Sequence, residues 1–247
     1  MKKLLVLILA GLAAISMITV SGCKNNPTGN HEAGIISRGS SGKLDRFEAE
    51  IKKFEEADQA QMPPKGAVLF TGSSSIRLWS SLEQDFAPLP VINRGFGGST
   101  IPEVNYYAQR IIYKYQPGVI VFYCGENDMA ENDAPPVVFQ NFKKFIGEVE
   151  KNLPKTTVII ISAKPSPQRW NLWRSFQQYN LMVEQFAKNR PNLRYMDVSG
   201  QLLGADGQPD PNFFVEDKLH LNSKGYERWT NVLKPIITEQ FQLKMAQ

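Results

Sequence analysis

The sequence predicts an α/β fold, a three-layer α/β/α sandwich built on a five-stranded parallel sheet. Short apolar runs rich in β-branched residues alternate along the chain with longer segments of helical spacing. The runs are almost continuously apolar, which is typical of parallel strands covered by helices on both faces. We expect strands at 66–71, 90–93, 118–124, 156–162 and 193–198, and helices at 103–115, 136–152, 173–189 and 223–243.

One further helix is expected before the first strand. Leu44, Phe47, Ile51 and Phe54 recur at helical spacing, with Glu and Lys residues between them. This spacing places the four apolar side chains on one face, so the segment is predicted to be an amphipathic helix. Proline disfavours the helical conformation in the residue before it, and the helix is therefore expected to end before Pro63.

The first residues have the pattern of an export signal. Lys2 and Lys3 precede an apolar run at 4–20, which small residues and Cys23 follow. This order is typical of a secretory signal, although the run is also near the lower length limit of an uncleaved membrane helix. Residues 20–23 resemble the lipobox of bacterial lipoproteins. The resemblance implies that residues 1–22 are removed, that Cys23 receives lipid, and that the protein resides in the cell envelope. If the cell is Gram-negative, the expected place is the periplasmic face or the outer membrane.

The remaining chain is expected to form a tether and one domain. Residues 23–43 are polar, rich in Gly, Asn and Ser, and without apolar periodicity, which predicts a flexible tether. Residues 44–247 are long enough for one domain with a full core. No internal repeat or second domain is apparent.

Composition excludes several classes of function. The chain has two cysteines and two histidines, too few for a transition-metal site of the usual kind. If Cys23 carries lipid, Cys124 has no disulfide partner, and its apolar neighbours predict a buried core residue. The net charge of +4 comes without a basic stripe interleaved with aromatic residues, so no nucleic-acid partner is expected. No cofactor is expected either.

Chemically versatile residues follow the predicted strands. In doubly wound sheets, functional residues gather at the carboxyl ends of the strands. Serines 73–75 follow the first strand, a glycine-rich stretch follows the second, and Asp217 and His220 precede the last helix. Serines in such places usually cap helices, and Asp217 could do the same, but Asn222 and Ser223 are the better cap candidates. Together the segments supply a hydroxyl, a base with an acidic partner, and hydrogen-bond donors, as acyl transfer requires.

Four segments, in their order along the chain, resemble the blocks of the SGNH (GDSL-type) hydrolase family. They are Gly72-Ser73-Ser74, Gly97-Gly98-Ser99-Thr100, Gly125-Glu126-Asn127-Asp128 and Asp217-Lys218-Leu219-His220. The resemblance covers about 45–243 and implies a flavodoxin-like sandwich. Ser73 stands where the family usually has Asp. The choice among adjacent serines therefore rests on the motif, which makes Ser74 the nucleophile.

The resemblance implies a serine esterase that works through an acyl-enzyme, without a metal. Ser74 would attack the ester, His220 would act as the base, and Asp217 would orient the imidazole. The oxyanion would be held by the backbone N–H groups of Ser74 and Gly98 and by the side-chain amide of Asn127. Asp128 is expected to support the loop.

The sequence indicates the substrate less clearly than it indicates the catalytic residues. Trp170 and Arg169 follow the fourth strand and are candidates for substrate binding, although Trp170 could equally be a core residue and a surface salt bridge is favoured for Arg169. No long apolar lid is apparent, which favours short acyl esters such as acetyl groups on carbohydrate. Alternatives are a lysophospholipase or thioesterase-type acylhydrolase, acyl transfer to a sugar, and a non-catalytic glycan-binding envelope protein. The sequence predicts no oligomeric state.

Overall fold

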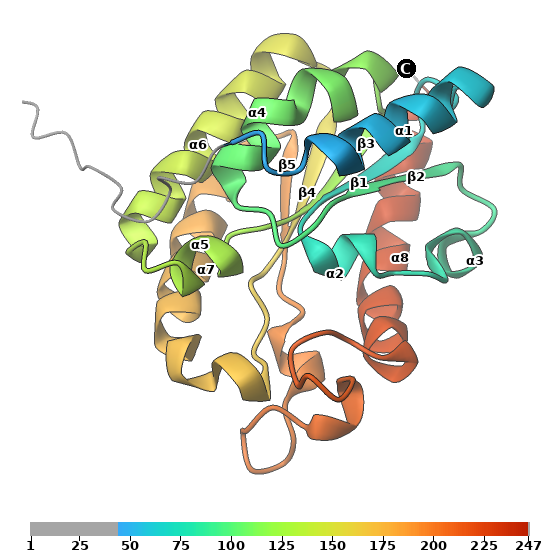
Figure 1. The fold of residues 1–247 in the computed structure, drawn as a ribbon. Coiled ribbons are helices and arrows are strands. Elements are labelled where there is room, and N and C mark those ends of the chain that lie inside the picture. Colours follow the sequence, from blue (N-terminus) through green and yellow to red (C-terminus); the bar gives the residue numbers. More distant parts are fainter. Residues whose placement is uncertain (1–43, 247) are drawn as a thin grey trace, which may run out of the picture. The chain divides into compact units, whose positions relative to one another are not determined.

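The computed structural model describes residues 44–246, so the predicted signal peptide, the lipid on Cys23 and the tether lie outside the described residues. The described chain is an α/β fold with a five-stranded, all-parallel sheet flanked by helices (Figure 1). This confirms the predicted fold class. The strands are β1 (Val68–Gly72), β2 (Val91–Gly95), β3 (Val119–Tyr123), β4 (Thr157–Ile161) and β5 (Leu193–Met196). Their order in the sheet, β2-β1-β3-β4-β5, is that of flavodoxin-like folds.

Each predicted helical segment contains a helix, and the structure adds several short ones. The helices are α1 (Glu48–Ala60), α2 (Ser74–Arg77), α3 (Leu82–Phe86), α4 (Ile101–Ile111), α5 (Glu126–Ala130), α6 (Pro135–Asn152), α7 (Trp173–Ala187) and α8 (Ser223–Met245). Short 3-10 helices are η1 (Tyr113–Tyr115), η2 (Pro167–Leu172), η3 (Ser199–Leu202) and η4 (Pro211–Phe213). The helix expected at 103–115 is interrupted at Ile112, whose φ of −129° and ψ of −63° are not helical.

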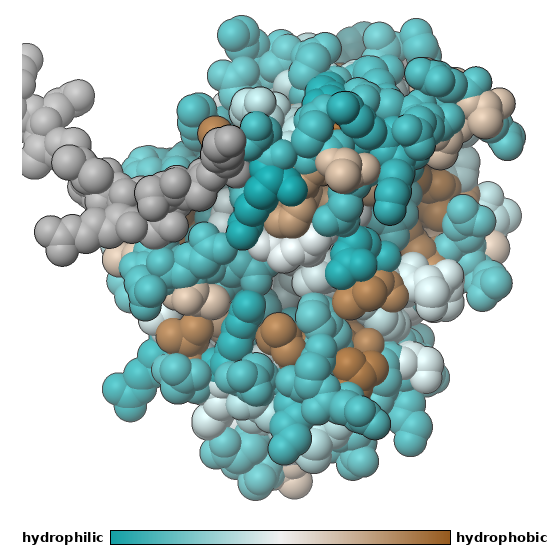
Figure 2. Space-filling model, in the orientation of Figure 1, coloured by the Kyte–Doolittle hydropathy of each residue, from teal (hydrophilic) through white to brown (hydrophobic). Residues whose placement is uncertain are grey.

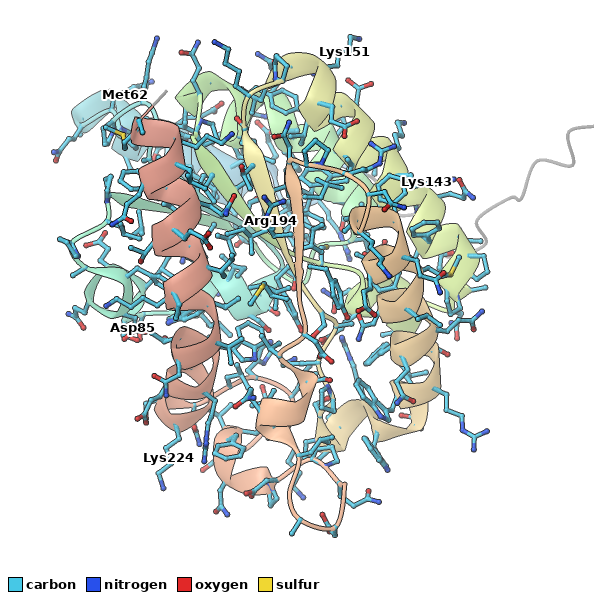
Figure 3. The ribbon with its side chains drawn as sticks, turned by 180° about the vertical axis from the view of Figure 1, so that it is seen from behind. Met62, Asp85, Lys143, Lys151, Arg194 and Lys224 are labelled. Atoms are coloured by element: carbon cyan, nitrogen blue, oxygen red, sulfur yellow. The ribbon has the colours of Figure 1, made fainter. Side chains whose placement is uncertain are left out.

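Two apolar cores lie on the two faces of the sheet. Successive side chains of a strand point to opposite faces, so β3 contributes to both. Ile120 and Phe122 pack with α1, α4, α6 and α7, whereas Val121 and Tyr123 pack with α2, α3 and α8. Viewed from behind, β5 lies at the sheet edge between α7 and α8, with Arg194 on it (Figure 3). The sheet is therefore the middle of three layers.

A buried ionic cluster attaches α1 to the edge of the sheet. Asp58 of α1 lies 2.5 Å from the Arg94 guanidinium of β2 and 2.6 Å from Lys114 Nζ. The hydroxyl of Tyr115 donates to the same carboxylate at 2.5 Å. Burial favours the neutral carboxyl, but these donors hold the pKa of Asp58 below its ordinary value. Because each charge has a partner, the cluster avoids the large cost of a lone buried charge.

The end of β1 comes unusually close to the end of β3. Gly72 has a φ of +126°, and a Cβ atom placed on it would lie 1.9 Å from the carbonyl oxygen of Tyr123. That oxygen accepts a hydrogen bond from the N–H of Ser73 at 3.0 Å, and Gly72 in turn accepts one from Phe96 N–H at 3.1 Å. The chain can therefore leave β1 and enter α2 only if residue 72 has no side chain.

We expect Gly72→Ala to lower the free energy of unfolding by about 3 kcal/mol or more, because the methyl group adds backbone strain and a steric clash. Gly147→Ala is the matched control, since no atom lies within 4 Å of its added Cβ on α6. Alanine there should stabilise the helix by roughly 0.5–1 kcal/mol. Urea unfolding of both variants measures the difference. Equal effects would contradict the steric constraint.

Candidate active site

The position of Ser74 is fixed by the start of α2. Ser73 is the N-cap residue in extended conformation, and its carbonyl accepts hydrogen bonds from the N–H groups of Ile76 and Arg77 at 3.0 and 3.2 Å. Ile76 is fully buried in the core, which holds the short helix against the sheet. The half-buried Ser74 is thus presented at the carboxyl end of β1.

A tight turn before α8 positions Asp217 and His220. The N–H of Val215 donates to the His220 carbonyl at 2.9 Å, and the N–H of Lys218 donates to the Val215 carbonyl at 2.9 Å. Lys218 has a φ of 57°, in the left-handed region that reverses the chain. Asn222 caps α8 by accepting from Gly225 N–H, so Asp217 is not the cap of that helix.

Ser74, His220 and Asp217 form a continuous chain of hydrogen-bonding groups. His220 Nε2 lies 2.8 Å from Ser74 Oγ, and His220 Nδ1 lies 2.6 Å from Asp217 Oδ2. The other oxygen of Asp217 accepts from the N–H groups of Leu219 and His220, at 2.8 and 2.9 Å. Partial burial would raise the pKa of Asp217, but the His220 side chain and these N–H donors bring it to about 2.

The ionised carboxylate determines the state of the neutral imidazole. A carboxylate only accepts, so Nδ1 carries the proton that it donates to Asp217. Nε2 is then the unprotonated nitrogen, and it faces the Ser74 hydroxyl. This arrangement can remove the hydroxyl proton as the oxygen becomes a nucleophile.

The glycine-rich stretch at 97–100 and the segment after β3 meet beside β1, the strand that Ser74 follows. Ser99 Oγ donates to the Gly72 carbonyl at 3.2 Å, which places this stretch at the end of β1. Asn127 Nδ2 donates to the Ser99 carbonyl at 3.0 Å. A Cβ on Gly98 would lie 3.8 Å from the same Nδ2 atom. The structure therefore brings Gly98 and Asn127 together at the strand ends that present Ser74, where donors to an oxyanion are needed.

A family model for the GDSL-like lipase/acylhydrolase family matches residues 66–228, more than half of the chain. The chain belongs to this family. The matched residues span the segments that carry Ser74, Gly98, Asn127, Asp217 and His220. No curated protein matches the chain.

Several solved structures share the fold of this chain. A Streptococcus pneumonia structure named for a platelet activating factor has a TM-score of 0.69 at 20% identity, covering 78% of this chain and 93% of its own. A GDSL-like lipase from Bacteroides thetaiotaomicron has a TM-score of 0.66 at 21% identity, covering 77% and 98%. An acetyl-xylooligosaccharide esterase from Geobacillus Stearmophilus has a TM-score of 0.55 at 15% identity, covering 72% and 95%. At these identities the likeness concerns the fold.

A buried ion pair that the sequence analysis did not predict lies beneath the site of this acylhydrolase. Lys164 lies three residues after β4, and its Nζ is 3.1 Å from Glu126 Oε2. Both side chains are almost fully buried. The backbone N–H of Lys164 donates to the other oxygen at 2.8 Å, and the Tyr123 hydroxyl also donates to Glu126. Burial alone would raise the pKa of Glu126, but Lys164 and Arg169 hold it below its ordinary value. The signal in the sequence was a lysine within three residues of the end of an apolar strand.

A surface salt bridge was expected for Arg169, but its ion pair with Glu126 is largely buried, so the expected surface location is wrong. The Arg169 side chain is only 19% exposed, and its Nη1 lies 3.7 Å from Glu126 Oε2. Its Nη2 donates to Asn127 Oδ1 at 2.9 Å. Arg169 is thus part of the site, because the 3-10 helix η2 folds back over the loop after β3.

The tryptophans divide into two pairs. Trp79 and Trp229 are fully buried, in T-shaped contact with each other in the core between the sheet and α8. Trp170 and Trp173 are half-buried and stack at a centroid distance of 5.9 Å and an interplanar angle of 15°. The second pair adjoins Arg169 along η2 and at the start of α7.

Other potential sites are weaker within residues 44–246. No cluster of His, Cys, Asp or Glu in this range could hold a metal ion. Cys124 is buried as expected, and its thiol donates to the Ser99 carbonyl at 3.3 Å. A hollow lined by Lys188, Arg190 and Arg194 lies where β5 begins, at the opposite end of the sheet from Ser74.

Asp128 attaches α5, the short helix that also carries Asn127, to the start of α4. Its two carboxylate oxygens accept from the Ile101 N–H at 3.1 and 3.2 Å, at the start of α4. Burial raises the pKa of Asp128 from 3.8 to about 7. The folded chain therefore holds this proton more tightly than the unfolded chain. The corresponding stability is fully present below about pH 4 and is lost as the pH rises towards 7.

We expect Asp128→Asn to remove this pH dependence, because the amide still accepts from Ile101 N–H but does not ionise. The free energy of unfolding of the wild type minus that of the variant should fall by on the order of 4 kcal/mol from about pH 4 to pH 8. Urea unfolding of both proteins across this range measures it, and the subtraction removes the other titrating groups. A constant difference would contradict the raised pKa.

Proposed function

We propose that this GDSL-family acylhydrolase is a serine esterase for short-chain acyl esters, with Ser74 as nucleophile. The observation that carries the proposal is the chain of contacts from Ser74 Oγ to His220 Nε2 at 2.8 Å and from His220 Nδ1 to Asp217 at 2.6 Å. A serine hydroxyl is a weak nucleophile by itself and requires such a base within hydrogen-bonding distance.

In the proposed reaction, Ser74 Oγ bonds to the ester carbonyl carbon while its proton moves to His220 Nε2. The carbonyl oxygen becomes an oxyanion, which accepts from the backbone N–H groups of Ser74 and Gly98 and from Asn127 Nδ2. The C–O bond to the alcohol then breaks, and His220 gives its proton to the leaving oxygen. Water attacks the acyl-enzyme in the same way and releases the carboxylic acid.

Asp217 stabilises the imidazolium that forms in each step. Its carboxylate is held by two backbone N–H groups as well as by His220. With a pKa of about 2, it is ionised at neutral pH. The acid therefore orients the ring without taking its proton.

Two features favour a small, polar ester such as an acetylated carbohydrate. The face drawn in Figure 2 is mostly hydrophilic, and its hydrophobic residues are scattered in small groups rather than gathered in one large patch. A long acyl chain would need such a patch. Trp170, stacked on Trp173, offers a flat aromatic surface suited to a sugar ring. The fold likeness to an acetyl-xylooligosaccharide esterase is consistent with this substrate class.

We also propose that the enzyme is anchored in the cell envelope through lipid on Cys23. The support is the order of charged, apolar and small residues in 1–23. No helix within 44–246 is long and apolar enough to cross a membrane.

Hydrolysis of p-nitrophenyl esters of increasing acyl length by the full chain tests the proposed function. We expect the acetyl and butyryl esters to react fastest, and Ser74→Ala to lower kcat by at least about 10³-fold because the nucleophile is lost. Ser80→Ala is the matched control, since Ser80 is exposed and follows α2.

Each outcome has a distinct meaning. Equal rates for the wild type and Ser74→Ala would reject Ser74 as the nucleophile. A preference for long acyl chains would replace the short-acyl assignment by a lysophospholipase-type activity. Faster cleavage of matched thioesters would replace it by a thioesterase.

A further inference from the structure

The side-chain amide of Asn127 lies between two groups of opposite hydrogen-bonding character. Its Nδ2 donates to the Ser99 carbonyl at 3.0 Å, and its Oδ1 accepts from Arg169 Nη2 at 2.9 Å. A carbonyl can only accept and a guanidinium can only donate. The two ends of the amide are therefore distinguished by their partners, and a flipped amide would lose both hydrogen bonds.

The orientation of the amide decides whether Asn127 presents an N–H donor or an oxygen atom to the oxyanion. Nδ2 carries two N–H groups, and Ser99 takes one of them. Nδ2 also lies beside Gly98, whose missing side chain leaves the space next to it open. In the flipped orientation the amide oxygen would occupy this position and repel an oxyanion.

Arg169 is itself held in place. The η2 helix is capped by Ser166, whose hydroxyl accepts from the Arg169 N–H at 3.3 Å, and Ser166 is fully buried. The guanidinium is paired with Glu126, and Glu126 is fixed by Lys164 below it. The network therefore extends from the buried end of β4 to the Asn127 amide.

A guanidinium bonded to an amide oxygen does more than orient it. The positive charge draws electron density towards the oxygen and makes the N–H groups stronger donors. The effect is larger in a partly buried site, where water does not screen it. Stronger donors that are fixed before the reaction lower the energy of a transition state with oxyanion character.

We propose that Arg169 is a positioning residue that locks and polarises the Asn127 amide for oxyanion stabilisation, an inference that rests on the proposed esterase function. Arg169 acts through Asn127 and does not touch the substrate. Its loss therefore lowers kcat for a neutral ester, leaves KM nearly unchanged, and has little effect once Asn127 is gone.

A double-mutant cycle with the full chain tests this. The wild type, Arg169→Ala, Asn127→Ala and the double variant are assayed with p-nitrophenyl acetate, a neutral substrate. We expect Asn127→Ala to lower kcat by about 10²-fold or more, and Arg169→Ala by about 10- to 100-fold. The double variant should be no slower than Asn127→Ala alone, because the two residues share one effect.

Two further variants serve as controls. Arg174→Ala removes an exposed arginine from the first turn of α7 and should leave kcat within about twofold. Arg169→Lys keeps the charge near Glu126 but lacks the planar fork that also reaches Asn127. If Arg169→Ala does not fold, as urea unfolding would show, the same cycle is run with Arg169→Lys.

Additive losses in the cycle would overturn the proposal, since Arg169 would then act independently of Asn127. An unchanged kcat with a raised KM would overturn it in favour of direct substrate binding. If Ser74→Ala hydrolyses the ester as fast as the wild type, the esterase function fails and the positioning role falls with it. If Ser74→Ala is inactive and Arg169→Ala is fully active, only the positioning role fails.

Discussion

The close approach of β1 to β3 is the constraint on which the rest of the site depends. These strands are neighbours at the point where the strand order reverses, and the end of β1 has no room for a side chain at Gly72. The contact lets Ser73 N–H bond to the Tyr123 carbonyl, which starts α2 at the next residue. The Gly72 carbonyl in turn receives Ser99 Oγ, so the glycine-rich stretch is attached at the same place. One steric constraint thus sets the positions of both the nucleophile and the loop beside it.

Around this packed point, the site is built from buried polar groups that satisfy one another. Glu126 and Lys164 neutralise each other beneath the loop after β3, and Asp128 binds the start of α4. Such groups are costly to bury. A protein with apolar residues of similar shape in their place is often equally stable or more stable, so these groups add little net stability. Their benefit is directional, because a hydrogen-bonded amide or carboxylate has one favourable orientation whereas an apolar side chain has several. The outer part of the site, formed by Asp217 and His220, is by contrast held by a tight turn at the surface.

The sequence predicted the sheet well because apolar, β-branched runs are a direct signature of buried strands, and β3 and β4 are such runs. It predicted the gathering of Ser74, Gly98, Asn127, Asp217 and His220 from the order of the motifs. It did not predict α2, α3 or α5, since four or five residues are too few for helical periodicity. The sequence also did not predict the pairing of Glu126 with Lys164, because that pairing depends on which strands are neighbours. It did not predict the location of Arg169, because that location depends on the path of η2. The burial of the tryptophan side chains could not be predicted from the sequence either. Trp79 and Trp170 both follow strands and differ only in their tertiary packing.

In the proposed mechanism, His220 makes Ser74 nucleophilic. Labelling with a fluorophosphonate tests this role, because the serine oxygen displaces fluoride from phosphorus without any need for the natural substrate. The labelled full chain is digested and the modified peptide is identified by mass spectrometry. A single adduct on Ser74 should form rapidly in the wild type and at a negligible rate in His220→Ala. An adduct on Ser73 or Ser75, or labelling of Ser74 at the same rate without His220, would contradict it.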